Sequence, residues 1–306
     1  MFGPYYVKDR RTELKRWGFM ITCLYSRAVH IELLEDMSTD TFIQALRCFM
    51  AVRRPVNTII CDNGTNIVGA KNELEKELDQ AEPSLMEYLL QTRIDFKFNS
   101  PNASQQGGVT ERMIRSVKAV LNGMARKHRN RMDKKTLRTG FNEAVNIVNN
   151  RPLTAAFINN PEDNIITPNQ LLTMKDKTVR APPPGKFHRE DMYGKSRWKA
   201  SQQWAEEFWS AWKSDYLQVI MVRQKWQMEK ENIKVGDVVI VKDDSIARGD
   251  WRIGVVTEAR GETDGLVRNV EVRLGNRNLD KKEKILREPT VFRRPIQKVV
   301  VLVKAE

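Results

Sequence analysis

Residues 58–64 read Thr-Ile-Ile-Cys-Asp-Asn-Gly, a short apolar run that ends in a turn signal. The run predicts a buried strand, and Asp62 directly follows its C-terminal end. Open α/β sheets tend to place ligands and catalytic groups at that edge. Because Asp-Asn-Gly is also a common turn sequence, the stretch alone leaves a purely structural role for Asp62 open.

The elements before this strand form a regular pattern. Two nearly continuous apolar runs, residues 18–25 and 28–34, are separated by a short break and predict a buried β-hairpin. Ser38 or Thr39 can cap a helix that follows the hairpin, and Pro55 prevents its continuation. A hairpin and one helix therefore precede the strand that ends before Asp62.

The elements after it continue an alternating order. Helical patterns recur at residues 66–78 and 84–91, and apolar residues alternate over residues 94–98 as one more strand. Two basic helices are expected at residues 109–129 and 133–150. This order of strands and helices is that of an α/β domain built on a mixed sheet with flanking helices.

This interpretation divides the chain into four stretches. Residues 1–155 form the α/β domain, and residues 156–200, poor in periodicity and containing a Pro-Pro-Pro-Gly run, form an extended linker. Residues 201–231 form an aromatic helix that acts as a helical connector. Short β-type runs separated by turns over residues 232–304 predict a small C-terminal β-barrel.

The aromatic helix and the barrel carry further candidate residues. Tryptophans of the helix region could stack on bases, but the near-helical spacing of Trp204, Phe208 and Trp212 favours a packing or subunit-contact stripe. Arginines of the barrel could follow phosphates, although acidic residues interleave with them; they are Arg248, Arg252, Arg268, Arg273, Arg293 and Arg294.

Composition and charge restrict the class of protein. The 306 residues are 41% hydrophobic and 30% charged, and their net charge of +13 favours a polyanionic partner, either nucleic acid or an anionic membrane surface. No apolar run approaches the roughly 18 residues that span a bilayer, and the first twenty residues lack a signal-peptide pattern. We therefore expect no membrane partner.

The cysteines indicate the compartment. Three cysteines lie far apart, and with three histidines they offer no zinc-finger spacing. We expect them to be buried thiols in a reducing compartment. The protein is then intracellular, and nuclear if its partner is chromosomal DNA.

The positive charge is concentrated in one stretch. Residues 112–151 hold eleven Lys or Arg and only two acidic residues, Asp133 and Glu143, which is typical of a phosphate-binding surface or, less specifically, of a solvated helix face. Helical geometry places Glu111 and Asn122 on one stripe with four cations: Arg115, Lys118, Arg126 and Arg129. A second stripe is apolar and can pack on the sheet. Glu111 alone can also be read as a residue that complements the helix dipole.

A carboxylate beside a row of cations suits a metal-dependent reaction on a nucleic-acid backbone. In such reactions acidic side chains hold two Mg²⁺ or Mn²⁺ ions about 4 Å apart, which activate the nucleophile and stabilise the leaving oxygen. Hard divalent ions take carboxylate oxygens, so Asp62 and Glu111 are chemically suitable ligands.

Several motifs resemble one family. They are Phe-Gly-Pro at residues 2–4, Cys-Asp-Asn-Gly-Thr-Asn at 61–66, Gly-Gly-Val-Thr-Glu-Arg at 107–112, Asn-Arg-Pro-Leu-Thr at 150–154 and Val-Gly-Asp-Val-Val at 235–239. In this order they resemble the integrase region of BEL/Pao-type LTR retrotransposons, over nearly the whole chain. The resemblance implies an RNase H-like catalytic core with an Asp-Asp-Glu metal site, followed by the family's C-terminal domain.

Residue by residue, Asp62 matches the second catalytic aspartate of that family and Glu111 the catalytic glutamate. The family's first aspartate stands two positions before the Phe of Phe-Gly-Pro, which would be one residue before Met1. The sequence is thus expected to be truncated at its N-terminus and catalytically impaired. Asp9 lies too far along the extended chain to substitute readily.

The sequence predicts an integrase-like protein that binds DNA, forms a homo-oligomer and takes no small-molecule substrate. The resemblance implies metal-dependent polynucleotidyl transfer, which we expect to be impaired because the first aspartate is missing. Asp62 and Glu111 are the expected catalytic and metal-binding residues, and the expected nucleic-acid contacts are Arg112, Arg115, Lys118, Arg126, Lys127 and Arg129. One alternative is a non-catalytic DNA-binding or assembly protein derived from a retrotransposon. Another is a nuclease on the same fold, because a fold alone does not determine the reaction.

Overall fold

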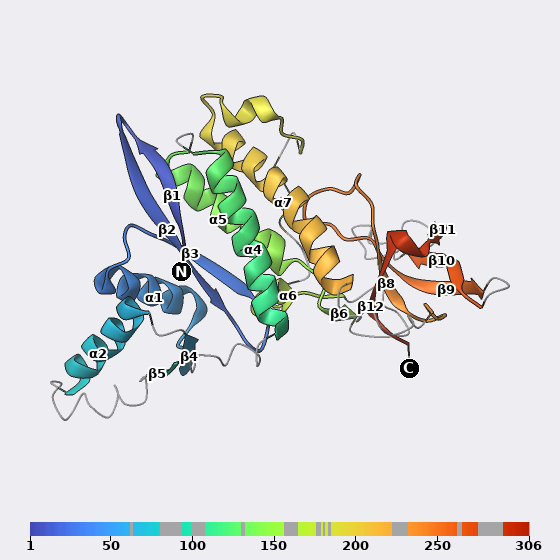
Figure 1. Ribbon diagram of the computed structural model, residues 1–306, viewed down its shortest axis with the longest axis horizontal. Helices are drawn as coiled ribbons and strands as arrows, with labels where there is room; N and C mark the ends of the chain where they lie inside the picture. Colours follow the sequence, from blue (N-terminus) through green and yellow to red (C-terminus); the bar gives the residue numbers. More distant parts are fainter. Residues whose placement is uncertain are drawn as a thin grey trace. The chain divides into compact units, whose positions relative to one another are not determined.

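The computed structural model describes residues 1–61, 64–79, 94–98, 108–129, 132–155, 165–175, 179, 181–182, 185–221, 232–261, 265–274 and 290–305 (Figure 1). Contacts divide the chain into two units. The first comprises Met1–Thr22 and Val29–Asn142, and the second comprises Cys23–Ala28 and Glu143–Glu306. Each unit has a hydrophobic core of its own.

The first unit begins with an antiparallel sheet of three strands, in the order β1 (Phe2–Asp9), β2 (Thr12–Thr22) and β3 (Val29–Leu34). The pairing of β2 with β3 confirms the predicted hairpin. Gly18 leaves room for the Phe2 ring on the paired strand: a Cβ at position 18 would lie 2.2 Å from that ring and force it to move. The β1–β2 ladder ends with Asp9 paired to Thr12, at the opposite end from Phe2.

A second group of elements packs on this sheet. Helix α1 (Thr39–Arg53) begins at Ser38, whose hydroxyl accepts the Thr41 amide N–H at 3.2 Å, as the sequence predicts. Strands β4 (Thr58–Cys61) and β5 (Asp95–Phe98) pair in parallel, and α2 (Thr65–Asp79) lies between them in sequence. Their apolar side chains share one core with the first sheet: Phe19, Leu34, Phe42, Leu46 and Ala70, with Ile59 and Phe96 at its margin.

Two basic helices follow. Helix α4 (Gly108–Lys127) packs on β1, and α5 (Lys134–Asn149) contributes Phe141, whose ring meets Tyr5 edge-on with centroids 5.1 Å apart. Both helices agree with the predicted ranges to within two residues. The mixed α/β character of this part of the chain is therefore confirmed.

The second unit contains short elements before its long helix. Strands β6 (Thr154–Ala155) and β7 (Ile165–Ile166) pair, and α6 (Pro168–Thr173) starts with a capping box formed by Thr167 and Gln170. A 3₁₀ helix, η1 (Arg189–Met192), precedes α7 (Arg197–Met221). The stretch expected to be an extended linker thus contains helical elements, because local capping stabilises turns that hydrophobic periodicity does not reveal.

The C-terminal part of the second unit is an antiparallel sheet. Its strands are β8 (Val238–Val241), β9 (Ile253–Gly261), β10 (Val267–Leu274), β11 (Thr290–Pro295) and β12 (Val299–Val303), in the order β11-β10-β9-β8-β12. A short 3₁₀ helix, η2 (Ile296–Lys298), connects β11 to β12. Valines from four strands form one core, as expected for a small barrel. Among the described residues, however, no ladder joins β11 to β12.

Two further expectations concern the surface. The prediction that the cysteines are buried is wrong for Cys23 and Cys48, which are exposed, while Cys61 is half-buried. Cys23 lies in the turn between β2 and β3, and Cys48 lies on the outer side of α1, so neither position faces a core. Among the described residues, no helix combines the length and apolar character needed to cross a membrane.

Candidate nucleic-acid interface

One side of α4 fixes how the helix lies in the first unit. The predicted apolar stripe is buried: Met113, Val117, Val120, Leu121 and Met124 are all at most 9% exposed. The Tyr5 hydroxyl on β1 donates to Asn122 Oδ1 at 3.5 Å, and burial raises the pKa of Tyr5, so this phenol stays protonated. The apolar stripe therefore sets the rotation of α4 on the sheet.

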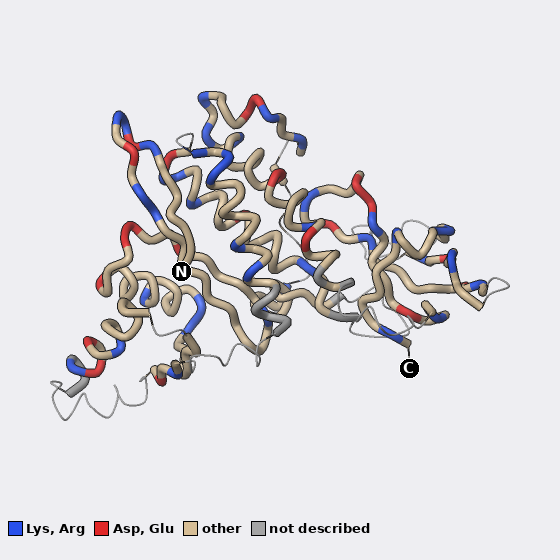
Figure 2. The backbone as a smooth tube through the Cα atoms, viewed as in Figure 1, with Lys and Arg blue, Asp and Glu red and all other residues tan. Residues whose placement is uncertain are grey.

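The opposite side of α4 carries cations at the surface. Arg115, Arg126 and Lys127 are exposed, and Lys118 is half-buried. Figure 2 shows Lys and Arg recurring along this helix. Because residues three and four apart lie on one face of a helix, Arg115 and Lys118 belong to a single row. Such a row can neutralise successive phosphates of a nucleic-acid backbone.

Arg129, just beyond α4, contacts the β1–β2 hairpin. Its Nε lies 3.4 Å from Glu13 Oε1, and its guanidinium lies 4.2 Å from the centroid of the Tyr6 ring. Both contacts hold the side chain against the sheet. Arg129 was predicted to be a phosphate ligand, and its position adds a structural role.

Two other cations of the basic stretch have partners within the protein. Lys134 pairs with Glu35 and lowers the pKa of that carboxyl by hydrogen bonding and by charge. Arg151 is 3% exposed and donates to the carbonyls of Val148 at 2.8 Å and Arg27 at 2.7 Å. Burial lowers the pKa of Arg151 to about 10, so the guanidinium stays charged at neutral pH. The charge count along the sequence therefore overstates the charge presented to a ligand.

The predicted metal ligands lie at the margin of the described residues. Strand β4 ends at Cys61, immediately before Asp62, which is outside the described residues. Helix α4 begins at Gly108, which places Glu111 in its first turn, but the side chains of Glu111 and Arg112 are also outside the described set. Within the described residues, no group of three His, Cys, Asp or Glu could hold a metal ion. The predicted pairing of Asp62 with Glu111 stays a prediction.

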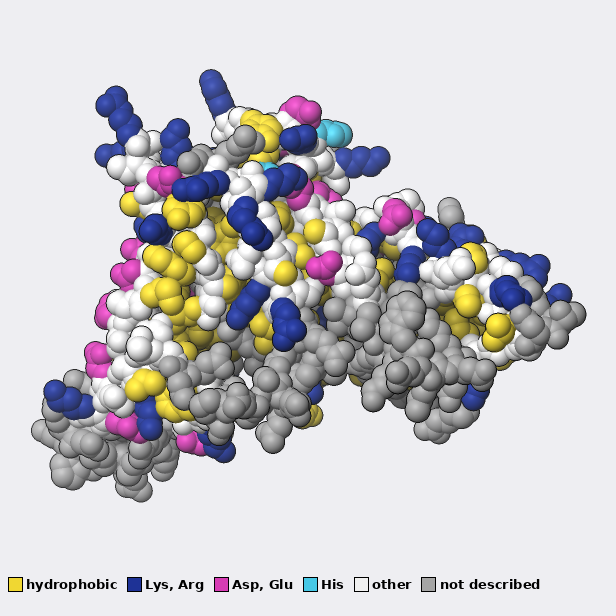
Figure 3. Space-filling model, viewed as in Figure 1, with side chains coloured by type: hydrophobic (Ala, Val, Ile, Leu, Met, Phe, Trp, Pro, Cys, Tyr) yellow, Lys and Arg dark blue, Asp and Glu magenta, His cyan; other side chains and the backbone are white. Residues whose placement is uncertain are grey.

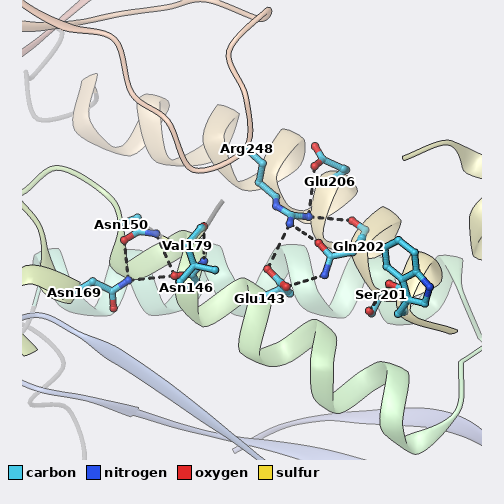
Figure 4. A network of polar contacts seen from close by, with 10 residues as sticks. Glu143, Asn146, Asn150, Asn169, Val179, Ser201, Gln202, Glu206 and Arg248 are labelled. Atoms are coloured by element: carbon cyan, nitrogen blue, oxygen red, sulfur yellow. Dashed lines mark hydrogen bonds and ion pairs between the residues drawn. The ribbon is translucent and has the colours of Figure 1, made fainter. Parts of the chain in front are cut away.

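In the second unit, the expectation that Arg248 follows phosphates is wrong. Its side chain is 4% exposed and lies between two carboxylates, 3.5 Å from Glu143 and 3.4 Å from Glu206 (Figure 4). It also donates to the backbone carbonyl of Gln202 at 3.1 Å, and the Gln202 amide donates to Glu143 at 2.8 Å. These contacts tie the loop between β8 and β9 to α7 and to the last turns of α5.

The network around Arg248 contains more carboxylates than cations. One guanidinium faces two carboxylates, and the side chains of Glu143 and Glu206 are 21% and 28% exposed. Burial raises the pKa of Glu206; Arg248 opposes this rise and Glu143 adds to it. A neighbouring set of amides, Asn146, Asn150 and Asn169, is linked by hydrogen bonds of 2.7–3.3 Å (Figure 4). The arrangement is that of a structural polar core.

The sequence offers no signal for this network. Arg248 is 46 residues from Gln202, and Gln202 is 59 residues from Glu143. Only the folded chain brings the three side chains together. Other barrel arginines pair locally: Arg252 contacts Asp243, and Arg260 contacts Glu258.

Comparisons with known proteins match the C-terminal part of the chain to one family model. The model of a family of unknown function (DUF5641) matches residues 196–302, from the end of the segment before α7 to β12. No curated protein matches the chain. Among solved structures, a chain of the simian T-cell lymphotropic virus intasome in complex with PP2A regulatory subunit B56 gamma is 12% identical, over 99% of this chain and 78% of that chain, with a TM-score of 0.34. A likeness of this size assigns neither fold nor function.

Proposed function

We propose that the protein is an integrase-like DNA-binding protein that acts on DNA by metal-dependent polynucleotidyl transfer. The observation that carries the proposal is the division of α4 into a buried apolar side and an exposed row of cations that includes Arg115 and Arg126. The motifs that resemble BEL/Pao-type integrases support it. Action on chromosomal DNA would place the protein in the nucleus, and a homo-oligomer would bring two DNA ends together.

Asp62 and Glu111 would hold the metal. Both are carboxylates, the donor type that Mg²⁺ and Mn²⁺ prefer; Asp62 directly follows β4, and Glu111 belongs to the first turn of α4. When bound, such ions activate a nucleophilic oxygen and stabilise the leaving oxygen. The contribution of the α4 cations is to bind and orient the DNA backbone without sequence preference, because phosphate contacts carry no base information.

A non-catalytic DNA-binding protein is the second candidate. It is favoured by the same exposed cations, which need no metal to bind phosphates. The two candidates differ only in whether DNA strands are joined. Binding and joining therefore have to be measured separately.

The binding test uses duplex DNA and the full chain at several salt concentrations. Arg115→Gln, Lys118→Gln and Arg126→Gln should each reduce the slope of log K against log salt by about 0.9, because each removes one phosphate contact. Arg47→Gln, which removes an exposed cation from α1, is the matched control and should leave the slope unchanged. An unchanged slope in all three α4 variants would contradict the proposal.

The metal test compares the wild-type chain with Asp62→Asn and Glu111→Gln. Calorimetric titration with Mn²⁺ should detect binding that both variants weaken, and a strand-transfer assay should lose any activity that the wild type has. Metal binding without strand transfer in the wild type would favour the non-catalytic candidate. No metal binding in the wild type would refute the assignment of these ligands.

A further inference from the structure

A second basic surface lies in the other unit, where η1 meets the start of α7. Residues 185–199, here called the η1–α7 surface, contain five Lys or Arg and two acidic residues. The cations are Lys186, Arg189, Lys195, Arg197 and Lys199. One of the two carboxylates is already engaged, because Asp191 Oδ2 accepts the His188 amide N–H at 2.9 Å to cap η1. The surface therefore presents an excess of positive charge.

This surface also exposes two aromatic rings. Trp198 is 49% exposed and Tyr193 is 50% exposed. Further along α7, by contrast, Trp204, Trp209 and Trp212 are at most 4% exposed. The part of α7 with buried tryptophans belongs to the core, and its first turn does not. Packing therefore explains the later tryptophans but does not explain the exposure of Trp198.

Trp198 is held in place although half of it faces solvent. Its ring meets the buried Phe187 ring edge-on, with centroids 5.9 Å apart and planes at 86°. The Lys199 ammonium lies 5.9 Å from the centroid of the Trp198 ring, and the Ser201 hydroxyl donates to the Trp198 carbonyl at 2.8 Å. The ring is thus supported at its edge beside a cation. Figure 3 shows hydrophobic side chains among Lys and Arg at the top of the view, where Figure 1 draws the segment before α7.

We propose that the η1–α7 surface binds single-stranded nucleic acid, with Trp198 stacking on a base and the surrounding cations contacting phosphates. Exposed aromatic rings beside cations are how proteins bind single strands without sequence preference. In a duplex the faces of the bases are already stacked on one another, so a fixed surface ring reaches only unpaired bases. The surface therefore prefers single strands or frayed ends to intact duplex.

The composition of the surface argues against a membrane as the ligand. An interfacial helix needs a broad apolar face. Residues 185–199 contain no Leu, Ile or Val, and two of their four aromatic or methionine side chains, Phe187 and Met192, are buried. What remains exposed is two separate rings among cations, which matches separate bases between phosphates.

This binding site does not depend on the function proposed for α4. The η1–α7 surface belongs to the second unit, and the α4 cations belong to the first. Loss of duplex binding in the α4 variants would not affect this proposal. Loss of single-strand binding in the variants of the η1–α7 surface would not affect the function proposed for α4.

The test measures fluorescence anisotropy of the full chain with labelled oligo-dT, with an abasic strand of equal length, and with a duplex. Trp198→Ala should weaken oligo-dT binding by about tenfold, which is within the range for loss of one base–aromatic stack, and should leave abasic-strand binding unchanged. Trp198→Phe should restore most of the affinity. Thermal unfolding of each variant checks that the fold is retained.

The charge component is tested by Lys195→Gln, with Lys175→Gln beyond α6 as the matched control, since both lysines are exposed. Lys195→Gln should reduce the salt slope by about 0.7 on both single strands, and the control should not. Equal affinities of Trp198→Ala and wild type for oligo-dT would overturn the proposal. So would an equal loss on oligo-dT and the abasic strand, or tighter binding to anionic phosphatidylserine vesicles than to oligo-dT.

Discussion

The two long helices, α4 and α7, use similar residue types in different ways. Helix α4 buries one apolar stripe and leaves its cations on the other side. Helix α7 is buried around most of its circumference from Ala200 to Phe208, polar side chains included. Its aromatic residues stack in sequence, with Trp204, Phe208, Trp212 and Tyr216 forming parallel neighbours 5.0–6.3 Å apart.

The difference shows that burial decides what a charged residue does. On α4, Arg115 can act on a ligand because its side chain is exposed to water. Beside α7, Arg248 is removed from water and must be satisfied by Glu143, Glu206 and Gln202. The first arrangement serves binding, and the second serves the fold.

The largest expected effect is on the aromatic row of α7. Trp212→Ala should lower the free energy of unfolding by about 4 kcal/mol, because Trp212 is fully buried against Phe208, Tyr216 and Trp251. Trp212→Phe should cost less, about 1–2 kcal/mol, since the buried indole N–H has no hydrogen-bond partner among the described residues. On α4, Arg115→Ala should change stability by less than about 0.5 kcal/mol. Chemical denaturation measures the free energy of unfolding of all three variants. Equal decreases in that free energy would contradict the contrast between the helices.

A smaller loss is expected when the buried cation is removed. Arg248→Met should cost about 3 kcal/mol, because it leaves Glu143 and Glu206 facing each other without a counterion. Arg260→Gln is the control in the same sheet: its side chain is 70% exposed, and solvent screens its pair with Glu258, so the free energy of unfolding should change little. Duplex DNA affinity should be unchanged in the Arg248 variant; a drop in affinity without unfolding would restore Arg248 as a ligand of phosphate.

A smaller effect is expected for the contact of Arg129 with Glu13, because both side chains are partly exposed. A double-mutant cycle with Arg129→Gln and Glu13→Gln should give a coupling energy of about 0.5 kcal/mol, as for exposed ion pairs. The value should fall as salt is added, because the pair is exposed. A coupling energy near zero at low salt would show that the contact with Glu13 does not give Arg129 a structural role.

The smallest expected effect is a pH dependence from Glu206. Because its pKa is raised in the folded protein, Glu206 keeps its proton over a range in which the unfolded chain has released it. Its contribution to stability is therefore lost as pH rises from the ordinary Glu pKa, about 4, through the folded value. The stability of Glu206→Gln relative to wild type should increase over that pH range. If the free energies of unfolding of the two proteins change with pH in parallel, the raised pKa of Glu206 is contradicted.

The structure follows from the sequence where a local pattern controls it. The hairpin of β2 and β3, the cap at Ser38 and the buried stripe of α4 all follow from residue spacing. The strand that ends at Cys61 is also confirmed, but the prediction that it is buried is wrong, because Thr58 is exposed and Ile60 is 52% exposed. These features depend on periods of two and 3.6 residues and on capping chemistry, which the sequence contains directly. For the candidate site, the exposure of Arg115, Arg126 and Lys127 agrees with helical geometry, while the roles of Asp62, Glu111 and the α4 cations stay predictions.

The sequence by itself determined the order of the described strands and helices from β2 to α5, the amphipathic character of α4 and the excess of positive charge, because each is a property of neighbouring residues. Only the tertiary structure decided that Arg248 and Arg151 are buried, that Arg129 lies on Tyr6, and that Trp198 is exposed while Trp204 is not. Those outcomes depend on which surfaces meet after folding. Contacts between residues tens to more than a hundred positions apart leave no periodic trace in one sequence, so charge count and spacing could not separate the binding cations from the structural ones.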